Sequence, residues 1–280
     1  PTRAGALQSP TSSSPPPPPV SGEESVDAIL DSVRRFRGVV VMLDALGMKG
    51  IWARREPSGV VEAWTGLVDR LQRVTSSFAE ANTDLCGSHR LAAFSDTMIL
   101  TLEANAEDTD LSKLIQLAGD ALLQPFLIGL LEGILLRGVI TAGDYYQSAL
   151  TMTAEPSGLL TIGPAIDEAA EWYDQGDWIG VSTVPSASFV LDRTNELEQP
   201  VSRSLARYDV PLSSGATEPV WALDWPGEAL KEHGSAARAA VLSVFAANPI
   251  PPVAVSKYRH SLAFFDHRLE ALATAGRDRE

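Results

Sequence analysis

The sequence predicts an α+β fold with a mostly antiparallel central sheet flanked by helices. Strand-like and helix-like segments do not alternate regularly along the chain, as they do in a doubly wound parallel fold. Two short strand patterns, at residues 89–94 and 97–103, are separated only by Ser-Asp, which predicts a tight antiparallel hairpin. A long apolar helix pattern over about 109–133 provides a core element against which such a sheet can pack.

The first part of the chain is rich in proline and serine over residues 1–22, including five consecutive prolines. Such a composition cannot form a packed core, so we expect this segment to be disordered. A helix is predicted over 23–36, followed by a buried strand, "GVVVMLD", at 38–44. Apolar residues then recur at three- and four-residue steps over 60–82, which predicts an amphipathic helix.

After the long helix, the segment "LLRGVITAGDYYQS" (135–148) predicts a strand whose glycines allow another backbone to approach closely. A strand or loop follows, then a helix that opens at "GPAIDEAAEWYDQ" (163–175) and a strand at 178–184. The segment "PVWALDW" (219–225) is predicted to be an edge strand, and an amphipathic helix over 256–274 closes the pattern.

The composition is that of a globular chain with a single large core. Its 280 residues are 45% hydrophobic and 21% charged, and we expect residues 23–280 to form one domain, with core motifs at 38–183 and a C-terminal part at 184–280. The most apolar stretch, 121–136, has only eleven uncharged residues before Glu132, whereas a membrane span needs about 20. We therefore expect a buried core helix and no membrane partner.

The charge and cysteine content restrict the partners and the compartment. A formal net charge of -14 argues against a nucleic-acid polymer as partner, because proteins that bind one normally carry a basic surface. A single nucleotide is not excluded. Cys86 is the only cysteine, so the chain has no disulfide framework and no cysteine-based metal site. We expect a reducing, cytoplasmic location.

Two aspartates interrupt apolar strands. Asp44 directly follows "VVVML", and Asp96 lies in the turn of the predicted hairpin. One aspartate at a strand end usually just begins a turn. Two of them on neighbouring strands point into one cleft, where like charges raise each other's pKa unless a cation lies between them. Mg²⁺ or Mn²⁺ suits such an oxygen site, and Gly47 and Gly50 allow backbone amides to turn toward an anion.

Four segments resemble, in order, the motifs of class III nucleotidyl cyclases. "VVVMLDALGMKG" resembles the first metal motif, and "FSDTMIL" resembles the hairpin that carries the second metal aspartate. "LRGVITAGDYY" is similar to the strand after the central helix, and "TIGPAIDEAAEW" is similar to the glycine-opening helix. The resemblance covers about residues 38–183 and implies a class III cyclase-like fold, with the active sites between the two subunits of a homodimer.

The resemblance also implies roles for residues of the first two motifs. Two Mg²⁺ or Mn²⁺ ions in each site would be held by Asp44, Asp96 and the carbonyl of Ala45. The phosphates of a nucleoside triphosphate would be bound by the backbone amides of Leu46, Gly47, Met48 and Lys49. The reaction implied is closure of the triphosphate to a 3′,5′-cyclic nucleotide with release of pyrophosphate.

The chain departs from the purine cyclases at the positions that read the base and stabilise the transition state. Ala92 and Leu160 stand where those enzymes carry polar base-reading side chains, and Asp167 and Glu171 stand where they carry Asn and Arg. With these departures the motifs look most like the pyrimidine cyclases of Pycsar anti-phage systems, which make cyclic UMP or cyclic CMP. A separate effector protein that reads the product is implied.

Loss of the Asn and Arg requires another cation to stabilise the developing charge. Lys257 and Arg259, in "SKYRH", are the first candidates, and Arg54 and Arg55 the second; each is equally well explained as a surface charge. Arg137 is expected in a structural salt bridge under the sheet rather than on the substrate.

Two other functions stay open, namely a purine cyclase with a rebuilt base pocket and an inactive nucleotide-binding regulatory module. The four histidines are expected at the surface: His89, His233, His260 and His267.

Overall fold

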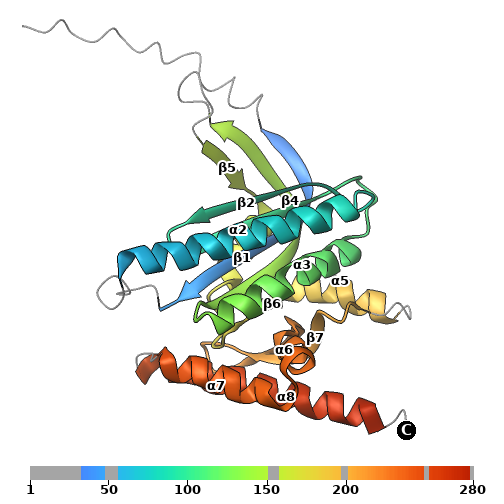
Figure 1. Ribbon diagram of the computed structural model, residues 1–280. Coiled ribbons are helices and arrows are strands. Elements are labelled where there is room, and N and C mark those ends of the chain that lie inside the picture. The colour runs from blue at the N-terminus through green and yellow to red at the C-terminus, as the bar shows by residue number, and fades with distance from the viewer. Residues whose placement is uncertain (1–32, 48–55, 151–157, 197–200, 249–251, 278–280) are drawn as a thin grey trace, which may run out of the picture.

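A computed structural model describes residues 33–47, 56–150, 158–196, 201–248 and 252–277 (Figure 1). Its sheet has eight strands in the order β2-β3-β1-β4-β6-β8-β7, with β5 paired to β4 off this path. Among these strands only the β4–β6 pair is parallel. The strands are β1 (Arg34–Leu46), β2 (Cys86–Phe94), β3 (Thr97–Ala104), β4 (Leu135–Leu150), β5 (Gly158–Ile162), β6 (Gly180–Thr183), β7 (Leu205–Pro211) and β8 (Thr217–Leu223).

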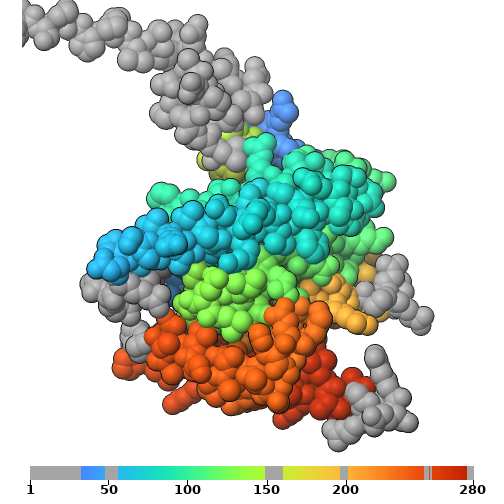
Figure 2. Space-filling model, in the orientation of Figure 1, coloured from blue at the N-terminus to red at the C-terminus, as the bar shows by residue number. Residues whose placement is uncertain are grey.

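Helices cover the sheet, so the predicted α+β fold with a mostly antiparallel, helix-flanked sheet is confirmed. In the space-filling view α2, α3 and the C-terminal helices follow one another as cyan, green and orange-red bands (Figure 2). The helices are α2 (Pro57–Ala81), α3 (Leu111–Leu131), α4 (Pro164–Trp172), α5 (Pro185–Glu196), α6 (Trp225–His233), α7 (Ala237–Ala247) and α8 (Val255–Arg277), with short 3-10 turns at Gly234–Ala236 and Pro252–Ala254.

The strand β1 forms the centre of the core, between β3 and β4. Its residues from Val39 to Leu43 are all buried. Because successive side chains of a strand point to opposite faces, both faces of β1 must be covered. The helices α3 and α4 both contact β1 and provide this cover. Gly138 of β4 allows the close approach that the sequence predicts, because a Cβ atom there would lie 2.2 Å from the Met42 carbonyl oxygen of β1.

The helix α3 is long and apolar enough to cross a membrane by length and composition, and it is the one such helix among the described residues. However, 67% of its most apolar window is buried inside the fold. Its buried residues include Leu114, Leu122 and Leu130, which belong to the main hydrophobic core. The prediction of a core helix is therefore confirmed.

Two local predictions are wrong. The first part of the helix predicted over 23–36, up to residue 32, lies outside the described residues. Its last part, Arg34–Phe36, forms the beginning of β1 instead of a helix. Pairing with β4 and stacking of Phe36 on Tyr145, with ring centroids 5.6 Å apart, override the local helical pattern. The strand β8, predicted as an edge, is paired with both β6 and β7, and β7 forms that edge instead. The segment 1–22, predicted to be disordered, lies outside the described residues.

Candidate active site

The two aspartates predicted to share a site lie on neighbouring parts of the sheet. Asp44 is near the end of β1, opposite Thr97 of β3, the residue that follows Asp96. The backbone amide of Ala45 donates to the carbonyl of Asp96 at 2.9 Å. Ser95, in the turn before Asp96, has a φ of 57°, a left-handed conformation that the two-residue hairpin connection requires. The sheet register therefore brings the two chain segments into direct contact.

The carboxylate of Asp44 lies in a partly buried and negatively charged environment. Its side chain is 14% exposed, and its Oδ2 atom accepts a hydrogen bond from Nε of Arg137 at 3.0 Å. Burial raises the pKa of Asp44, and the charges of Asp96 and Asp174 add to this effect, although Arg137 opposes it. The net pKa lies above its ordinary value. Three carboxylates, those of Asp44, Asp96 and Asp174, thus interact beside the guanidinium of Arg137.

This donor set fits a hard divalent cation. Carboxylate and carbonyl oxygens are the protein ligands that Mg²⁺ accepts, usually one or two carboxylates together with substrate phosphates. Burial is the main cause of the raised pKa of Asp44, and a cation beside Asp44 and Asp96 would relieve the repulsion that adds to it. Within the described part of the chain, no group of three or more His, Cys, Asp or Glu side chains could hold a metal ion. Water molecules in the free protein, and the phosphates of a substrate in the complex, would therefore complete the coordination.

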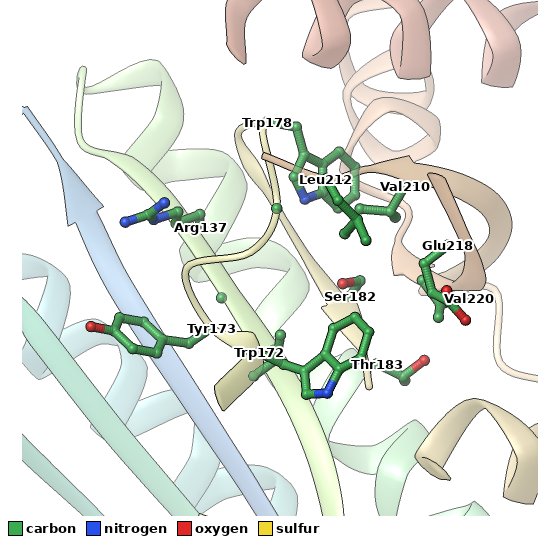
Figure 3. Close-up of a pocket in the computed structure, with 13 residues that line it drawn as sticks. Arg137, Trp172, Tyr173, Trp178, Ser182, Thr183, Val210, Leu212, Glu218 and Val220 are labelled. Atoms are coloured by element: carbon green, nitrogen blue, oxygen red, sulfur yellow. The ribbon is translucent and has the colours of Figure 1, made fainter. Parts of the chain in front are cut away.

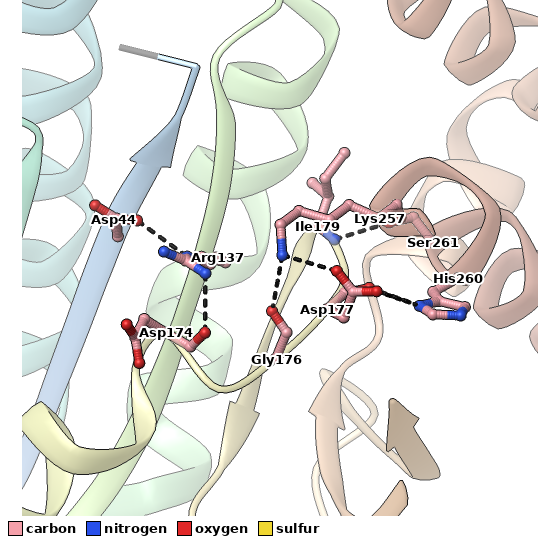
Figure 4. Close-up of polar contacts among 9 residues, drawn as sticks. All are labelled: Asp44, Arg137, Asp174, Gly176, Asp177, Ile179, Lys257, His260 and Ser261. Carbon is pink, nitrogen blue, oxygen red and sulfur yellow. Dashed lines mark hydrogen bonds and ion pairs between the residues drawn. The ribbon is translucent and has the colours of Figure 1, made fainter. Parts of the chain in front are cut away.

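Arg137 forms the salt bridge that the sequence predicts, and its partner is Asp44. Residues 44 and 137 are directly opposite each other in the β1–β4 register. While Nε binds Asp44, Nη1 of the same guanidinium donates to the backbone carbonyl of Asp174 at 2.9 Å (Figure 4). Asp174 belongs to the loop between α4 and β6. Arg137 thus joins the candidate metal ligand to this loop.

The same loop is held from the other side by α8. Nζ of Lys257 donates to Oδ1 of Asp177 at 2.9 Å, and Nδ1 of His260 lies 3.3 Å from Oδ2 of Asp177 (Figure 4). Burial acts to raise the pKa of Asp177, but hydrogen bonds from Ser256 and Lys257 and the nearby positive charges outweigh it. The pKa of Asp177 is consequently lower than its ordinary value, and the carboxylate is stabilised as an anion.

A pH-dependent stability follows for Asp177. Because its pKa is lowered in the folded state, its stabilising contribution is complete above the unfolded-state pKa of 3.8 and is lost as the pH falls through the lower folded-state value. We expect the free energy of unfolding of the wild type to exceed that of Asp177→Asn by a constant amount above about pH 5 and by less below it. Urea unfolding of both proteins across this range checks this. A difference that stays constant to the lowest pH would contradict it.

The other predicted site residues lie at different places on the surface. Arg259 is exposed on the first turns of α8, and Ala92 is exposed on β2. Leu160 of β5 is 37% exposed and pairs with Ser148 of β4. Leu46 is half-buried, and Gly47 is exposed with a φ of 80°. Four predicted residues lie outside the described ones: Met48, Lys49, Arg54 and Arg55.

The cavity next to Arg137 is too small for a nucleotide. It lies between β4, the loop after α4 and the β6–β8 strands, and Trp172, Trp178 and Leu212 are among its lining residues (Figure 3). Its volume is about 10 Å³, close to the lower limit for one water molecule. Neither Ala92 nor Leu160 lines it. The cavity therefore reflects packing beneath the loop and is not a substrate pocket.

Three residues of this region are missing from the sequence-based site: Asp174, Asp177 and His260. The segment "WYDQGDW" carries two aspartates around a glycine, directly after the predicted helix, and this is the signal that could have drawn attention to it. His260 lies at the surface as predicted, with 38% of its side chain exposed, and its ring also contacts Asp177. Their roles depend on contacts with residues 37 to 83 positions away, which local patterns do not reveal.

No family model matches the chain, and no curated protein matches it significantly. Several solved structures are similar in the path of the backbone. The catalytic core of a rhodopsin-guanylyl cyclase with converted specificity, in complex with ATPαS, is 12% identical, with 68% of this chain and 97% of that chain covered and a TM-score of 0.47. The guanylate cyclase domain of RhGC from Catenaria anguillulae in complex with GTP gives the same values. The adenylyl cyclase CyaB from P. aeruginosa is 10% identical, with 68% and 95% covered and a TM-score of 0.47. At these identities and TM-scores the likeness assigns no activity to this chain.

Proposed function

We propose that the protein is a nucleotidyl cyclase that converts UTP or CTP to the 3′,5′-cyclic nucleotide and pyrophosphate. The observation that carries the proposal is the contact between the two segments that contain Asp44 and Asp96, together with the partly buried position of the Asp44 carboxylate. These are the carboxylates that the motif order assigns to Mg²⁺ or Mn²⁺. The product would act as a second messenger in anti-phage defence, read by a separate effector protein.

Each group of residues has a role in this reaction. Asp44, Asp96 and the carbonyl of Ala45 would hold two metal ions, and the backbone amides after Ala45 would bind the phosphates. When bound, the ions lower the pKa of the ribose 3′-hydroxyl and neutralise charge on the triphosphate. The 3′-oxygen bonds to the α-phosphorus as the bond to the bridging oxygen breaks. The hydroxyl proton passes to water, and pyrophosphate leaves in line.

The positive charge for the transition state would come from α8. Arg259 is exposed, so it has no buried contact to lose when it meets a substrate. Lys257 is paired with Asp177 in the free protein and must leave this partner before it can contact a substrate. Of the two predicted cations, Arg259 therefore fits a direct role more easily.

One observation favours a second candidate, an inactive regulatory module. Asp44 is already neutralised in part by Arg137, and Asp167 and Glu171, both exposed on α4, replace the transition-state Asn and Arg of the family. A protein of this kind would bind nucleotide without turning it over. Incubation with each of the four nucleoside triphosphates and Mn²⁺, followed by mass spectrometry, separates the candidates. A cyclic pyrimidine product supports the proposal, a cyclic purine product supports a rebuilt base pocket, and binding without product supports the inactive module.

A homodimer is part of the proposal. The exposed positions of Ala92 and Leu160 allow a second subunit to cover them and complete a base pocket. We expect Asp44→Ala and Leu160→Arg proteins, each inactive alone, to recover activity when their subunits are exchanged. If subunits mix randomly, half of the dimers carry one working site of two, so about a quarter of wild-type activity should return.

Mixing Asp44→Ala with Asp96→Ala is the matched control for this exchange. Both residues belong to one half of the site, because their segments are in contact within a single chain. Each mixed dimer would therefore have a defect in both sites, and no activity should return. If the Asp44→Ala and Leu160→Arg mixture also stays inactive, although mass measurements show mixed dimers, the site lies within one subunit.

A further inference from the structure

One face of α8 holds the loop formed by residues 173–179, which joins α4 to β6. Lys257, His260, Ser261 and Phe264 follow the i, i+3, i+4, i+7 spacing that places side chains on one side of a helix. All four contact this loop. We call them the loop-binding face of α8.

The contacts of this face fix both the backbone and the side chains of the loop. Besides its ion pair with Asp177, Lys257 donates to the carbonyl of Gly176 at 3.4 Å. Nδ1 of His260 lies 2.7 Å from the carbonyl oxygen of Asp177. The hydroxyl of the fully buried Ser261 accepts the amide hydrogen of Ile179 at 2.8 Å. The helix α8 therefore anchors the loop through backbone atoms at three of its seven residues.

Packing adds a further anchor next to Asp177. The indole ring of Trp178, which is fully buried, meets the ring of Phe264 edge-on with centroids 5.2 Å apart. Tyr208 of β7 packs against both rings, at 5.9 Å from Trp178 and 4.5 Å from Phe264. Edge-on and offset ring pairs of this kind have defined geometries, so the loop cannot slide along α8 without losing them.

The other end of the loop reaches the candidate metal ligand. The carbonyl of Asp174 accepts from Nη1 of Arg137, whose Nε donates to Asp44 (Figure 4). A guanidinium is planar and rigid, so the position of one acceptor constrains the direction of the other hydrogen bond. A shift of the loop would therefore rotate Arg137 and change how it orients the carboxylate of Asp44.

We propose that Asp177 is a positioning residue for the candidate metal site, acting through the loop and Arg137 on Asp44. This proposal rests on the proposed function, because it assumes that Asp44 binds the metal. It gives the loop-binding face of α8 a role in the site, although α8 follows the cyclase-like motifs in the sequence. Changes to residues that orient metal ligands typically weaken metal binding by about 10- to 100-fold.

The test uses the whole chain and measures Mn²⁺ binding without nucleotide, by electron paramagnetic resonance. We expect Asp177→Asn to weaken Mn²⁺ binding by about 10-fold. The milder variant His260→Gln should act in the same direction, so the result does not depend on one variant folding. Asp266→Asn is the matched control, because it removes an α8 carboxylate whose partner is Arg238 and not the loop. It should leave Mn²⁺ binding unchanged.

A second readout follows Arg137 itself. The Nε–H resonance of Arg137, assigned by its loss in Arg137→Lys, reports the hydrogen bond to Asp44. We expect it to shift in Asp177→Asn and His260→Gln and to stay in place in Asp266→Asn. An unchanged resonance together with wild-type Mn²⁺ affinity in both loop variants would overturn the proposal.

Two further outcomes separate this proposal from others. If Asp177→Asn increases turnover, Lys257 acts directly on the substrate once released, and the positioning role is overturned while the cyclase assignment stands. If Asp96→Ala does not weaken Mn²⁺ binding in an otherwise wild-type chain, the metal site itself is wrong. The proposed function and the positioning role are then both overturned.

Discussion

Replacing either Asp44 or Asp96 with alanine is expected to abolish turnover while the protein stays folded. Each variant removes one of the two carboxylates assigned to the metal ions, which leaves too few oxygen ligands to hold Mg²⁺ or Mn²⁺ beside the substrate. A bound metal supplies several kcal/mol of transition-state stabilisation, and roughly 1.4 kcal/mol corresponds to a tenfold change in rate, so we expect a loss of about 10³-fold or more. Initial rates at saturating Mn²⁺ measure it.

The fold should tolerate both changes. Burial raises the pKa of Asp44, which means that its ionised form is not well stabilised in the folded protein without metal. Asp44→Ala leaves Arg137 without its carboxylate partner. Asp44→Asn keeps a hydrogen-bond acceptor for Arg137, so it should be measured beside Asp44→Ala. Thermal unfolding of each variant should remain a single cooperative transition.

Asp144→Ala is the matched control for these variants. Like Asp44, Asp144 is a carboxylate of the β1–β4 pair that bonds to an arginine of the opposite strand, in this case Arg35 of β1 at 2.8 Å. It is not part of the proposed site, so its removal should leave the rate close to wild type. Near-normal rates in Asp44→Ala or Asp96→Ala at saturating metal would contradict the two-metal assignment.

The second large effect concerns the base. We expect UTP or CTP to be cyclised in preference to ATP and GTP. A site that hydrogen-bonds its substrate rejects an analogue lacking the right groups by about 10⁴-fold or more. The two positions that read purines in the resembling family are Ala92 and Leu160, whose side chains neither donate nor accept hydrogen bonds. A purine held there would leave polar ring atoms unpaired, at a cost of about 1–3 kcal/mol for each group.

Competition among the four triphosphates in one reaction measures this preference directly, and we expect UTP to be used slightly more than CTP. Installing polar side chains at the same positions, as Ala92→Lys with Leu160→Asp, tests the reason. This variant should move the preference toward ATP. Dominant cyclic AMP or cyclic GMP from the unmodified protein would overturn the pyrimidine assignment and leave the cyclase assignment standing.

The sequence by itself predicts most of the elements and both aspartates of the candidate site. The apolar run before Asp44, the two-residue connection at Ser95 and Asp96, and the helical periods of α2, α3 and α8 depend on spacing within one segment. Such spacing is visible without knowledge of the fold, because the periods of strands and helices are local properties. The two wrong predictions, at Arg34–Phe36 and at β8, both depend on which strand pairs with which.

Only the tertiary structure decides the partners of the charged residues. Arg137 meets Asp44 across 93 positions of sequence, because the β1–β4 register places the two opposite each other. Lys257 meets Asp177 across 80 positions, because α8 packs beside the loop after α4. Strand register and helix packing are set by the complementarity of whole surfaces, which no short segment contains. Charged side chains can reach many partners, so their pairing is determined only when the backbone is in place.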